Sequence, residues 1–214
     1  MIVSPSVLAV DYSRMNEQVA QLNASGAQWL HFDVMDGHFV PNLTFGPDIL
    51  KGFKKLSPLF MDVHLMVSDP AFFAKVFQDA GADLITFHYE AMESDEAIRK
   101  LAQEIHARGG KAGLSVKPKT DVTVLEKFLH DFDLFLIMSV EPGFGGQSFM
   151  ENSLEKMSWL RGKLDEAGLN AHIEVDGGIN DKTGARAKEA GADVLVAGSY
   201  VFKNDIGKAV KSLE

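Results

Sequence analysis

The chain has 214 residues, of which 46% are hydrophobic and 24% charged, as is typical of a folded globular protein. Its formal net charge of -9 argues against a nucleic-acid partner, and the absence of cysteine excludes disulfides, thiolate metal ligands and a cysteine nucleophile. No apolar run is long enough to cross a membrane and the first residues lack the pattern of a signal peptide, so we expect a cytoplasmic protein.

Short strand-like runs alternate with helical patterns along the whole chain. Strands are predicted at residues 2–8, 29–34, 61–66, 83–88, 111–116, 133–138, 171–175 and 193–197. Helices are predicted at residues 13–24, 47–55, 71–80, 93–108, 121–130, 150–167, 182–190 and 205–213. This alternation indicates βαβ units around a parallel sheet.

A weak internal repeat supports eight units. Gly26, Gly81 and Gly191 each follow a predicted helix directly and precede a strand, where a left-handed cap requires glycine. They are spaced by 55 and 110 residues, two and four multiples of about 27, which is also about one eighth of 214. We therefore predict one (β/α)8 TIM-barrel domain over residues 1–214. The alternative is a doubly wound sheet, whose early G-x-G-x-x-G turn is absent.

Acid and imidazole side chains occupy the ends of three predicted strands. His31 and Asp33 share one face of the second strand, His64 lies on the third, and Asp176 ends the seventh. Reactive residues of a barrel lie at the C-terminal ends of its strands. A single His is usually structural and a strand-end Asp is often a helix cap. Two of each on matching faces predict a divalent-cation site, for which zinc, iron or manganese is suitable.

Glycine-rich turns follow the last three predicted strands. Residues 142–147 follow the sixth, Gly177 and Gly178 the seventh, and Gly198 and Ser199 the eighth. Glycines let backbone N–H groups approach an anion, and the loops after strands seven and eight commonly bind phosphate in this fold. One such turn indicates only a tight turn, but three together predict a phosphate site.

Other polar and apolar residues leave two interpretations open. His88, at the end of the fourth strand, either faces a substrate or is a structural histidine. Met35, Met66 and Met138 are either ordinary core or an apolar surface beneath a planar intermediate. Residues 36–38 are predicted to be a turn without a chemical role, and residues 121–127 a solvated helix face.

Four segments resemble the ribulose-phosphate 3-epimerase family. The longest is His31-Phe32-Asp33-Val34-Met35-Asp36-Gly37-His38-Phe39-Val40-Pro41-Asn42. Residues 62–66, 138–147 and 174–178 are similar to further motifs of this family, in the same order. The resemblance extends from Ser4 to Ser199, nearly the whole chain, and so implies an isomerase on a barrel of the ribulose-phosphate binding type.

The resemblance also implies roles for particular residues. The family interconverts D-ribulose 5-phosphate and D-xylulose 5-phosphate in the pentose phosphate pathway, as a dimer or hexamer with one divalent metal ion: zinc first, with iron, manganese or cobalt as alternatives. The implied metal ligands are His31, Asp33, His64 and Asp176, and the implied proton carriers are Asp33 and Asp176. The implied substrate contacts are Ser6, Met35, His64, Met66, Met138, Gly143, Phe144, Gly145, Gly146, Gly177, Gly178, Gly198 and Ser199.

Three alternatives remain beside this interpretation. The allulose-6-phosphate 3-epimerases are similar, but tend to carry Ala and Ser where this chain has Gly145 and Gly178. A barrel decarboxylase or lyase often uses a strand-end Lys, which strands two, three and seven lack. A non-catalytic phosphosugar-binding barrel would not need the paired His and Asp residues. One departure from many family members is Lys117, which stands where they carry Asn.

Overall fold

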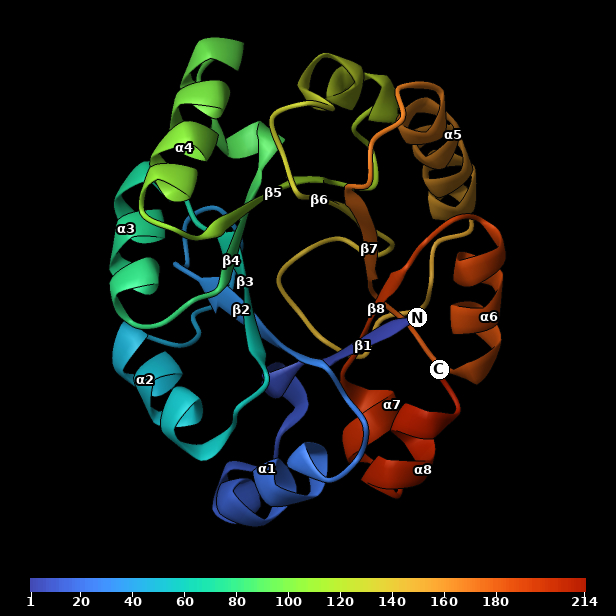
Figure 1. Ribbon diagram of the computed structural model, residues 1–214. Coiled ribbons are helices and arrows are strands. Elements are labelled where there is room, and N and C mark those ends of the chain that lie inside the picture. Colours follow the sequence, from blue (N-terminus) through green and yellow to red (C-terminus); the bar gives the residue numbers. More distant parts are fainter.

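Eight parallel strands form one barrel in a computed structural model that describes residues 1–214 (Figure 1). The strands are β1 Ile2–Pro5, β2 Trp29–Met35, β3 Phe60–Met66, β4 Leu84–His88, β5 Lys111–Val116, β6 Leu134–Met138, β7 His172–Asp176 and β8 Val194–Ala197. Their order is β1-β8-β7-β6-β5-β4-β3-β2, and a parallel bridge from Ser6 to His31 joins the two edges. The predicted (β/α)8 barrel is confirmed.

Helices surround the barrel. They are α1 Met15–Asn23, α2 Pro47–Leu56, α3 Pro70–Asp79, α4 Asp95–Ala107, α5 Asn152–Glu166, α6 Asp181–Glu189, α7 Ser199–Phe202 and α8 Ile206–Lys211. Side-chain caps start several of them, such as Ser94 on α4 and Asn180 on α6. The three repeat glycines have φ angles of 91°, 107° and 102°, as their predicted left-handed caps require. None of these helices has both the length and the apolarity needed to span a membrane.

Some predicted boundaries were wrong. The strand predicted at residues 2–8 ends at Pro5, and Val7–Ala9 form a 3-10 turn because the Ser6 hydroxyl accepts a hydrogen bond from the Leu8 N–H. The α-helix predicted at residues 121–130 is the 3-10 helix Val122–Phe128. Its β-branched residues disfavour an α-helix, and its buried side chains recur every third residue, which suits three residues per turn. Helix α7, after β8, was not predicted.

Alternation along the strands separates the apolar layer from the barrel interior. In β2, Leu30, Phe32 and Val34 belong to the large buried cluster under the helices, whereas His31 and Asp33 point inward. The register sets Asp33 beside His64, His31 beside Asp62 and Met35 beside Met66. Polar inward residues of neighbouring strands are therefore gathered in shared layers.

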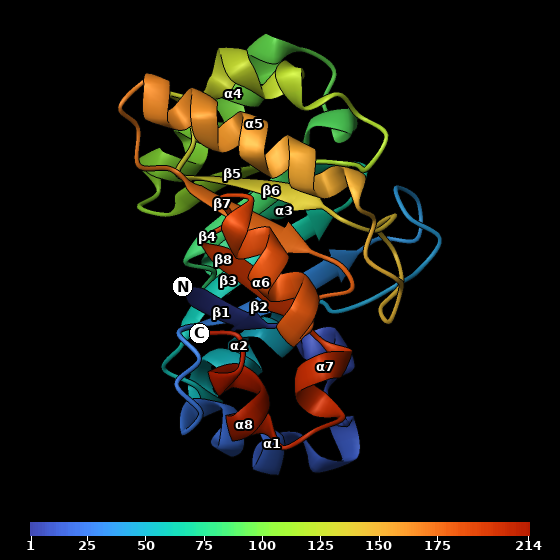
Figure 2. The same ribbon diagram turned by 90° about the vertical axis from the view of Figure 1, so that its right-hand side faces the viewer.

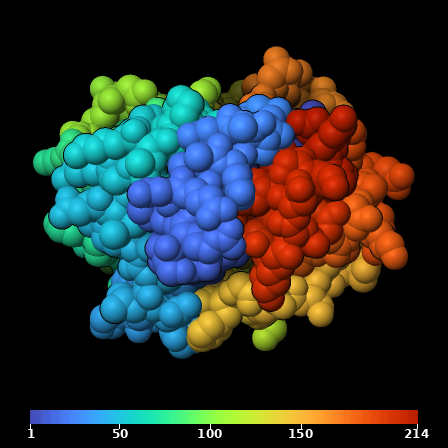
Figure 3. Space-filling model, turned by 90° about the horizontal axis from the view of Figure 1, so that it is seen from below, coloured from blue at the N-terminus to red at the C-terminus, as the bar shows by residue number.

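The two ends of the barrel differ in chemistry. The N-terminal ends of most strands carry apolar residues, including a Trp29–Phe60 ring pair with centroids 4.6 Å apart. At the other end, the loops after β2 and β6 project together (Figure 2), and the Asn42 side chain donates to the Gly143 carbonyl at 2.8 Å. Chain segments near the two termini pack side by side, α1 against α8 (Figure 3). The polar end is the predicted mouth.

Candidate active site

A cavity of about 780 Å³ opens at the C-terminal ends of the strands. Its lining includes all but two of the predicted site residues, namely Ser6, Asp33, Met35, Met66, Met138, Gly143, Phe144, Gly145, Gly146, Asp176, Gly177, Gly178, Gly198 and Ser199. The other two, His31 and His64, are fully buried next to it. Residues from the loops after β1, β6, β7 and β8 thus meet at one mouth, as the sequence predicts.

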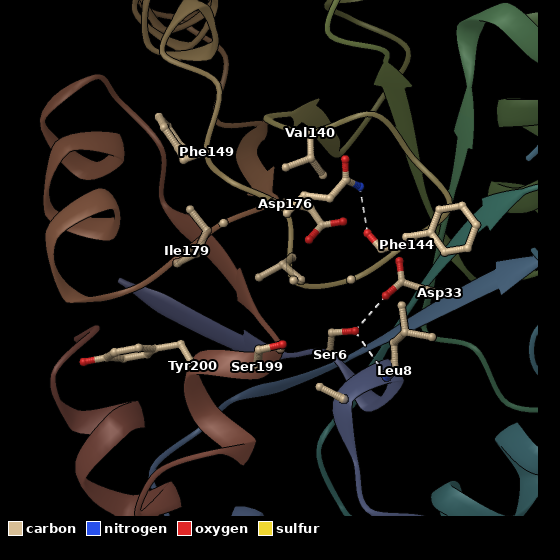
Figure 4. A pocket seen from close by; sticks show the side chains of 18 of the residues that line it. Ser6, Leu8, Asp33, Val140, Phe144, Phe149, Asp176, Ile179, Ser199 and Tyr200 are labelled. Atoms are coloured by element: carbon tan, nitrogen blue, oxygen red, sulfur yellow. Dashed lines mark hydrogen bonds between the residues drawn. The ribbon is translucent and has the colours of Figure 1, made fainter.

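Four predicted ligands converge beside this cavity. One nitrogen or oxygen atom from each of His31, Asp33, His64 and Asp176 lies within 4.8 Å of the others. Strands β2, β3 and β7 supply these residues, and Figure 4 shows the Asp33 and Asp176 carboxyl groups facing the same pocket from different strands. The set brings together two nitrogen and two oxygen donors from three strands.

Asp33 occupies the centre of the cluster. Its Oδ2 accepts a hydrogen bond from the Ser6 hydroxyl at 2.7 Å (Figure 4). Its Oδ1 lies 3.3 Å from His31 Nε2 and 3.3 Å from His64 Nδ1. His31 Nε2 is buried without a hydrogen-bond partner. An orphaned nitrogen beside carboxylate oxygens fits a divalent cation, because buried polar atoms otherwise find partners.

A buried carboxylate stands behind His31 and was missed in the sequence. Asp62 Oδ2 lies 2.6 Å from His31 Nδ1 and accepts from the Ser4 hydroxyl at 3.0 Å. This contact directs the opposite nitrogen, Nε2, towards Asp33, as carboxylates behind metal-binding imidazoles commonly do. The sequence signal that could have revealed it is strand parity, because Asp62 is two residues before His64 on the same face of β3.

Glu174 is a second buried acid in the same layer. It is two residues before Asp176, and neither of its oxygens has a hydrogen-bond partner. Burial raises the pKa of Glu174 well above its ordinary value, and the charge of Asp62 raises it further. These effects favour the protonated form of Glu174, which reduces the charge repulsion between Glu174 and Asp62 in the barrel interior.

The two mouth carboxyls differ in their ionisation. Burial alone would raise the pKa of Asp33, but the neighbouring imidazoles of His31 and His64 lower it well below its usual range. Burial raises the pKa of Asp176 to about 7, with a further contribution from the charge of Asp33. One carboxyl that is ionised and another that holds a proton near neutral pH form an acid–base pair.

The glycine-rich turns border the other part of the cavity. Gly178 has a φ of +63°, and a Cβ there would lie 2.4 Å from the Phe149 nitrogen. Only glycine allows this close approach of two backbone segments. Lys203 is the only basic residue in the cavity lining, so an anion would depend mainly on backbone N–H groups.

The three methionines lie in two different apolar clusters. Met35 and Met66 pack with Val40, whereas Met138 packs with Val140 and Leu136. All three are nearly inaccessible to solvent and yet line the cavity. They therefore form separate apolar patches of the cavity wall, and a role beneath a planar intermediate stays a prediction.

His88 does not line the cavity. It is fully buried, and its Nε2 lies 2.9 Å from His64 Nε2. Burial lowers the pKa of His88 to about 4, which keeps the ring neutral. Of the two interpretations of His88, the one in which it faces the substrate is therefore wrong. Asp36 forms the predicted turn, accepting from the backbone N–H groups of His38 and Phe39.

Sequence comparisons identify relatives across nearly the whole chain. The ribulose-phosphate 3 epimerase family model matches residues 2–202. Ribulose-phosphate 3-epimerase from Mycobacterium bovis is 45% identical over 95% of this chain and 87% of its own length. The enzyme of that name from Synechocystis is 46% identical over 94% and 87%. Chloroplastic ribulose-5-phosphate-3-epimerase from Arabidopsis thaliana is 42% identical over 100% and 76%.

Solved structures support the fold independently. The 3-keto-L-gulonate-6-phosphate decarboxylase of Vibrio cholerae matches with a TM-score of 0.73 at 15% identity, over 100% of this chain and 94% of that one. A 3-hexulose-6-phosphate synthase matches with a TM-score of 0.70 at 18% identity, over 100% and 98%. At such low identity these matches bear on the barrel architecture alone. The family match and the curated relatives go further: this chain is an isomerase that belongs to the ribulose-phosphate 3-epimerase family.

Proposed function

We propose that this protein interconverts D-ribulose 5-phosphate and D-xylulose 5-phosphate, in the pentose phosphate pathway, by two-base proton transfer at C3. The observation that carries the proposal is the pair of carboxyls, Asp33 and Asp176, which face one pocket from different strands. Their pKa values are shifted in opposite directions, down for Asp33 and up for Asp176. Inversion at C3 requires removal of a proton next to a carbonyl and its return on the opposite face. Two carboxyls on different strands can flank the reacting carbon in this way.

In the proposed mechanism, the ionised carboxyl removes the C3 proton and the protonated one donates from the other side. Which of Asp33 and Asp176 begins as the base depends on the direction of the reaction. The resulting enediolate carries negative charge on the oxygens of C2 and C3. His31, Asp33, His64 and Asp176 would hold one divalent cation, zinc first, with iron, manganese or cobalt as alternatives. When bound, the cation supplies Lewis-acid stabilisation of that charge.

The rest of the mouth positions the sugar phosphate. Backbone N–H groups at Gly177, Gly178, Gly198 and Ser199 are proposed to bind the phosphate, with Gly143 to Gly146 closing over it. Met35, Met66 and Met138 exclude water from the reacting carbons. We also propose cytoplasmic location, a single domain over residues 1–214 and a homo-oligomeric assembly, a dimer or hexamer.

An epimerase assay with matched substitutions tests the two-base scheme. Asp33→Asn and Asp176→Asn are each expected to lose at least about a thousandfold in kcat, because each removes one proton carrier and one predicted ligand. Asp48→Asn is the control, since its side chain is 90% exposed. Circular dichroism checks that all three variants fold. Retention of a tenth of wild-type turnover by either mouth variant would contradict the scheme.

The same assay separates the alternatives. Ribulose 5-phosphate and D-allulose 6-phosphate are compared at equal concentration, before chelation, after chelation and after metal add-back. We expect activity on the pentulose to exceed that on the hexulose and to disappear on chelation. A preference for allulose 6-phosphate would instead support that 3-epimerase activity. Tight phosphosugar binding without turnover by the metal-loaded protein would support a non-catalytic barrel.

A further inference from the structure

A hydrogen-bonded chain leads from the metal-site face of His64 to the rim of the barrel. His64 Nδ1 lies 3.3 Å from Asp33 Oδ1, so this nitrogen faces the proposed metal position. His64 Nε2 is 2.9 Å from His88 Nε2, and His88 Nδ1 is 3.2 Å from Glu90 Oε2. Both imidazole rings are completely buried, and the Glu90 side chain is 21% exposed.

At the outer end of these hydrogen bonds, the Glu90 carboxylate is a hydrogen-bond acceptor. Glu90 Oε1 accepts from the Lys117 backbone N–H at 2.7 Å and also from the Thr120 hydroxyl. Two donors on one oxygen favour the ionised carboxylate, and these contacts, with those to His88, outweigh burial and lower the pKa of Glu90 to about 2. An ionised carboxylate has no proton to give, so His88 Nδ1 must be the donor to Glu90 Oε2.

That assignment determines every later proton in the chain. A neutral imidazole with its proton on Nδ1 has only a lone pair on Nε2. At 2.9 Å from His88 Nε2, His64 Nε2 must therefore carry the shared proton. The remaining nitrogen, His64 Nδ1, then has a free lone pair, and a divalent cation between it and the ionised Asp33 oxygen 3.3 Å away would take the place of a hydrogen bond.

The segment that holds Glu90 is itself anchored. The Lys156 ammonium, on α5, donates to the carbonyls of Pro118 and Thr120 at 2.7 and 2.6 Å. The Lys117 ammonium lies 3.8 Å from the centre of the Phe39 ring, whose centroid is 5.0 Å from that of His88. The Lys156 contacts therefore fix the segment that holds Glu90, and the Phe39 ring packs against His88.

We propose that Glu90 and His88 are positioning residues, which keep His64 in the tautomer that leaves Nδ1 free to bind the divalent cation. This inference rests on the metal site in the proposed function, and it extends that site to two residues that contact neither cation nor substrate. His31 has its carboxylate, Asp62, directly behind it. His64 reaches its carboxylate through one intervening imidazole.

The decisive variant is Glu90→Gln, which preserves shape and reverses one hydrogen bond. The Gln carbonyl still accepts from Lys117 and Thr120, but its amide now donates towards His88 Nδ1. His88 must then carry its proton on Nε2 and donate to His64, whose proton moves to Nδ1 and blocks the ligand position. In His88→Gln, the new side chain can still accept from His64 Nε2–H, so this larger change is expected to be milder.

Binding of Zn²⁺ and Co²⁺ to chelator-stripped protein is measured by competition with a chromophoric chelator. Glu90→Gln is expected to weaken binding by roughly ten- to a hundredfold, and His88→Gln by less. A purely structural role would give the opposite order. Glu93→Gln, an exposed neighbour, and His172→Gln, which loses a contact to Asp193 at the other end of the barrel, are controls with unchanged affinity.

Nitrogen NMR of histidine-labelled, metal-free protein provides a readout independent of binding. We expect a proton on His64 Nε2 and on His88 Nδ1 in the wild type, and on His64 Nδ1 in Glu90→Gln. Two results would overturn the positioning role of Glu90 and His88 alone: an unchanged metal affinity in Glu90→Gln, or a proton on Nδ1 of His64 in the wild-type protein. Failure of the wild-type protein to bind either cation would overturn both the proposed metal site and this positioning role.

Discussion

Both carboxylate oxygens of Asp33 have close polar neighbours. Its Oδ2 accepts a hydrogen bond from Ser6, and its Oδ1 lies 3.3 Å from both His31 Nε2 and His64 Nδ1. A buried carboxylate in this setting is stable only while cationic or donor groups face it. The nitrogen and oxygen atoms that converge on Asp33 are therefore suited to a divalent cation.

The buried imidazole of His88 makes a prediction about stability and pH. Its folded pKa of about 4 lies below the ordinary value of 6.5, so the unfolded chain binds more protons between these values. Its contribution is fully present above pH 6.5 and is lost as the pH falls towards 4. We expect the wild type to lose about 2 kcal/mol more than His88→Gln between pH 7 and pH 5.

Urea unfolding of chelator-treated protein at pH 5, 6 and 7 measures this difference. Other buried groups titrate in both proteins and largely cancel in the comparison. His172→Gln is a suitable control because its side chain is 38% exposed. If the gap between wild type and His88→Gln stayed constant across this pH range, His88 would not be buried in its neutral form.

At the scale of elements, strand parity and loop glycines explain how the mouth is assembled. Inward residues of β2, β3 and β7 occupy shared layers because the strands pair in a fixed parallel register. The loops after β6 and β7 then approach each other at Gly178, where no side chain fits. A change at this glycine should therefore affect the mouth before it affects the barrel.

Two glycine substitutions test this difference between loop and helix. Gly178→Ala is expected to raise the KM for the sugar phosphate at least tenfold, because φ is +63° and the new Cβ would meet the Phe149 backbone. Gly162→Ala, inside α5, meets no atom within 4 Å and should stabilise the fold by about 0.5–1 kcal/mol. Steady-state kinetics and thermal unfolding of both variants provide the measurements.

These two results also exclude a general effect of adding a methyl group. Gly162→Ala should keep the wild-type KM, since its helix covers the outside of the barrel (Figure 1). An unchanged KM in Gly178→Ala would argue against a phosphate site at this turn. Loss of stability in Gly162→Ala would show that the position is more crowded than the open space around it indicates.

At the scale of the whole molecule, six large hydrophobic side chains are exposed, and three of them lie on neighbouring elements. Leu43 is 76% exposed, Phe72 59% and Ile49 45%. They lie in the segment after β2 and the first turns of α2 and α3, which follow neighbouring strands. Exposed apolar residues on adjacent elements are typical of an assembly surface.

Sedimentation velocity tests the predicted homo-oligomer. We expect a dimer or hexamer for the wild type, and a shift to smaller species for Leu43→Ser combined with Phe72→Ser, because the changes remove apolar contact area. Tyr12→Ser, 47% exposed at another place, is the control for general effects. A monomeric wild type at micromolar concentration would contradict the assembly, without bearing on the epimerase proposal.

Much of the fold and the predicted ligand cluster follows from local sequence patterns. Alternation of strands and helices predicted the barrel, and residues two apart on a strand predicted that His31, Asp33, His64 and Asp176 would converge. Such patterns are visible in a sequence because side-chain direction has a fixed period within each strand. The segment at residues 121–130 was less predictable, because α- and 3-10 helices share similar apolar spacing over a few residues.

The hydrogen-bond partners of those ligands required the tertiary structure. That Asp62 lies behind His31, and that His88 connects His64 to Glu90, depends on the register between strands and on a loop from β5 that is distant in sequence. Residue type limits which atoms can donate or accept. Which nitrogen of His64 faces the proposed cation is decided only when neighbouring strands place their side chains within hydrogen-bonding distance.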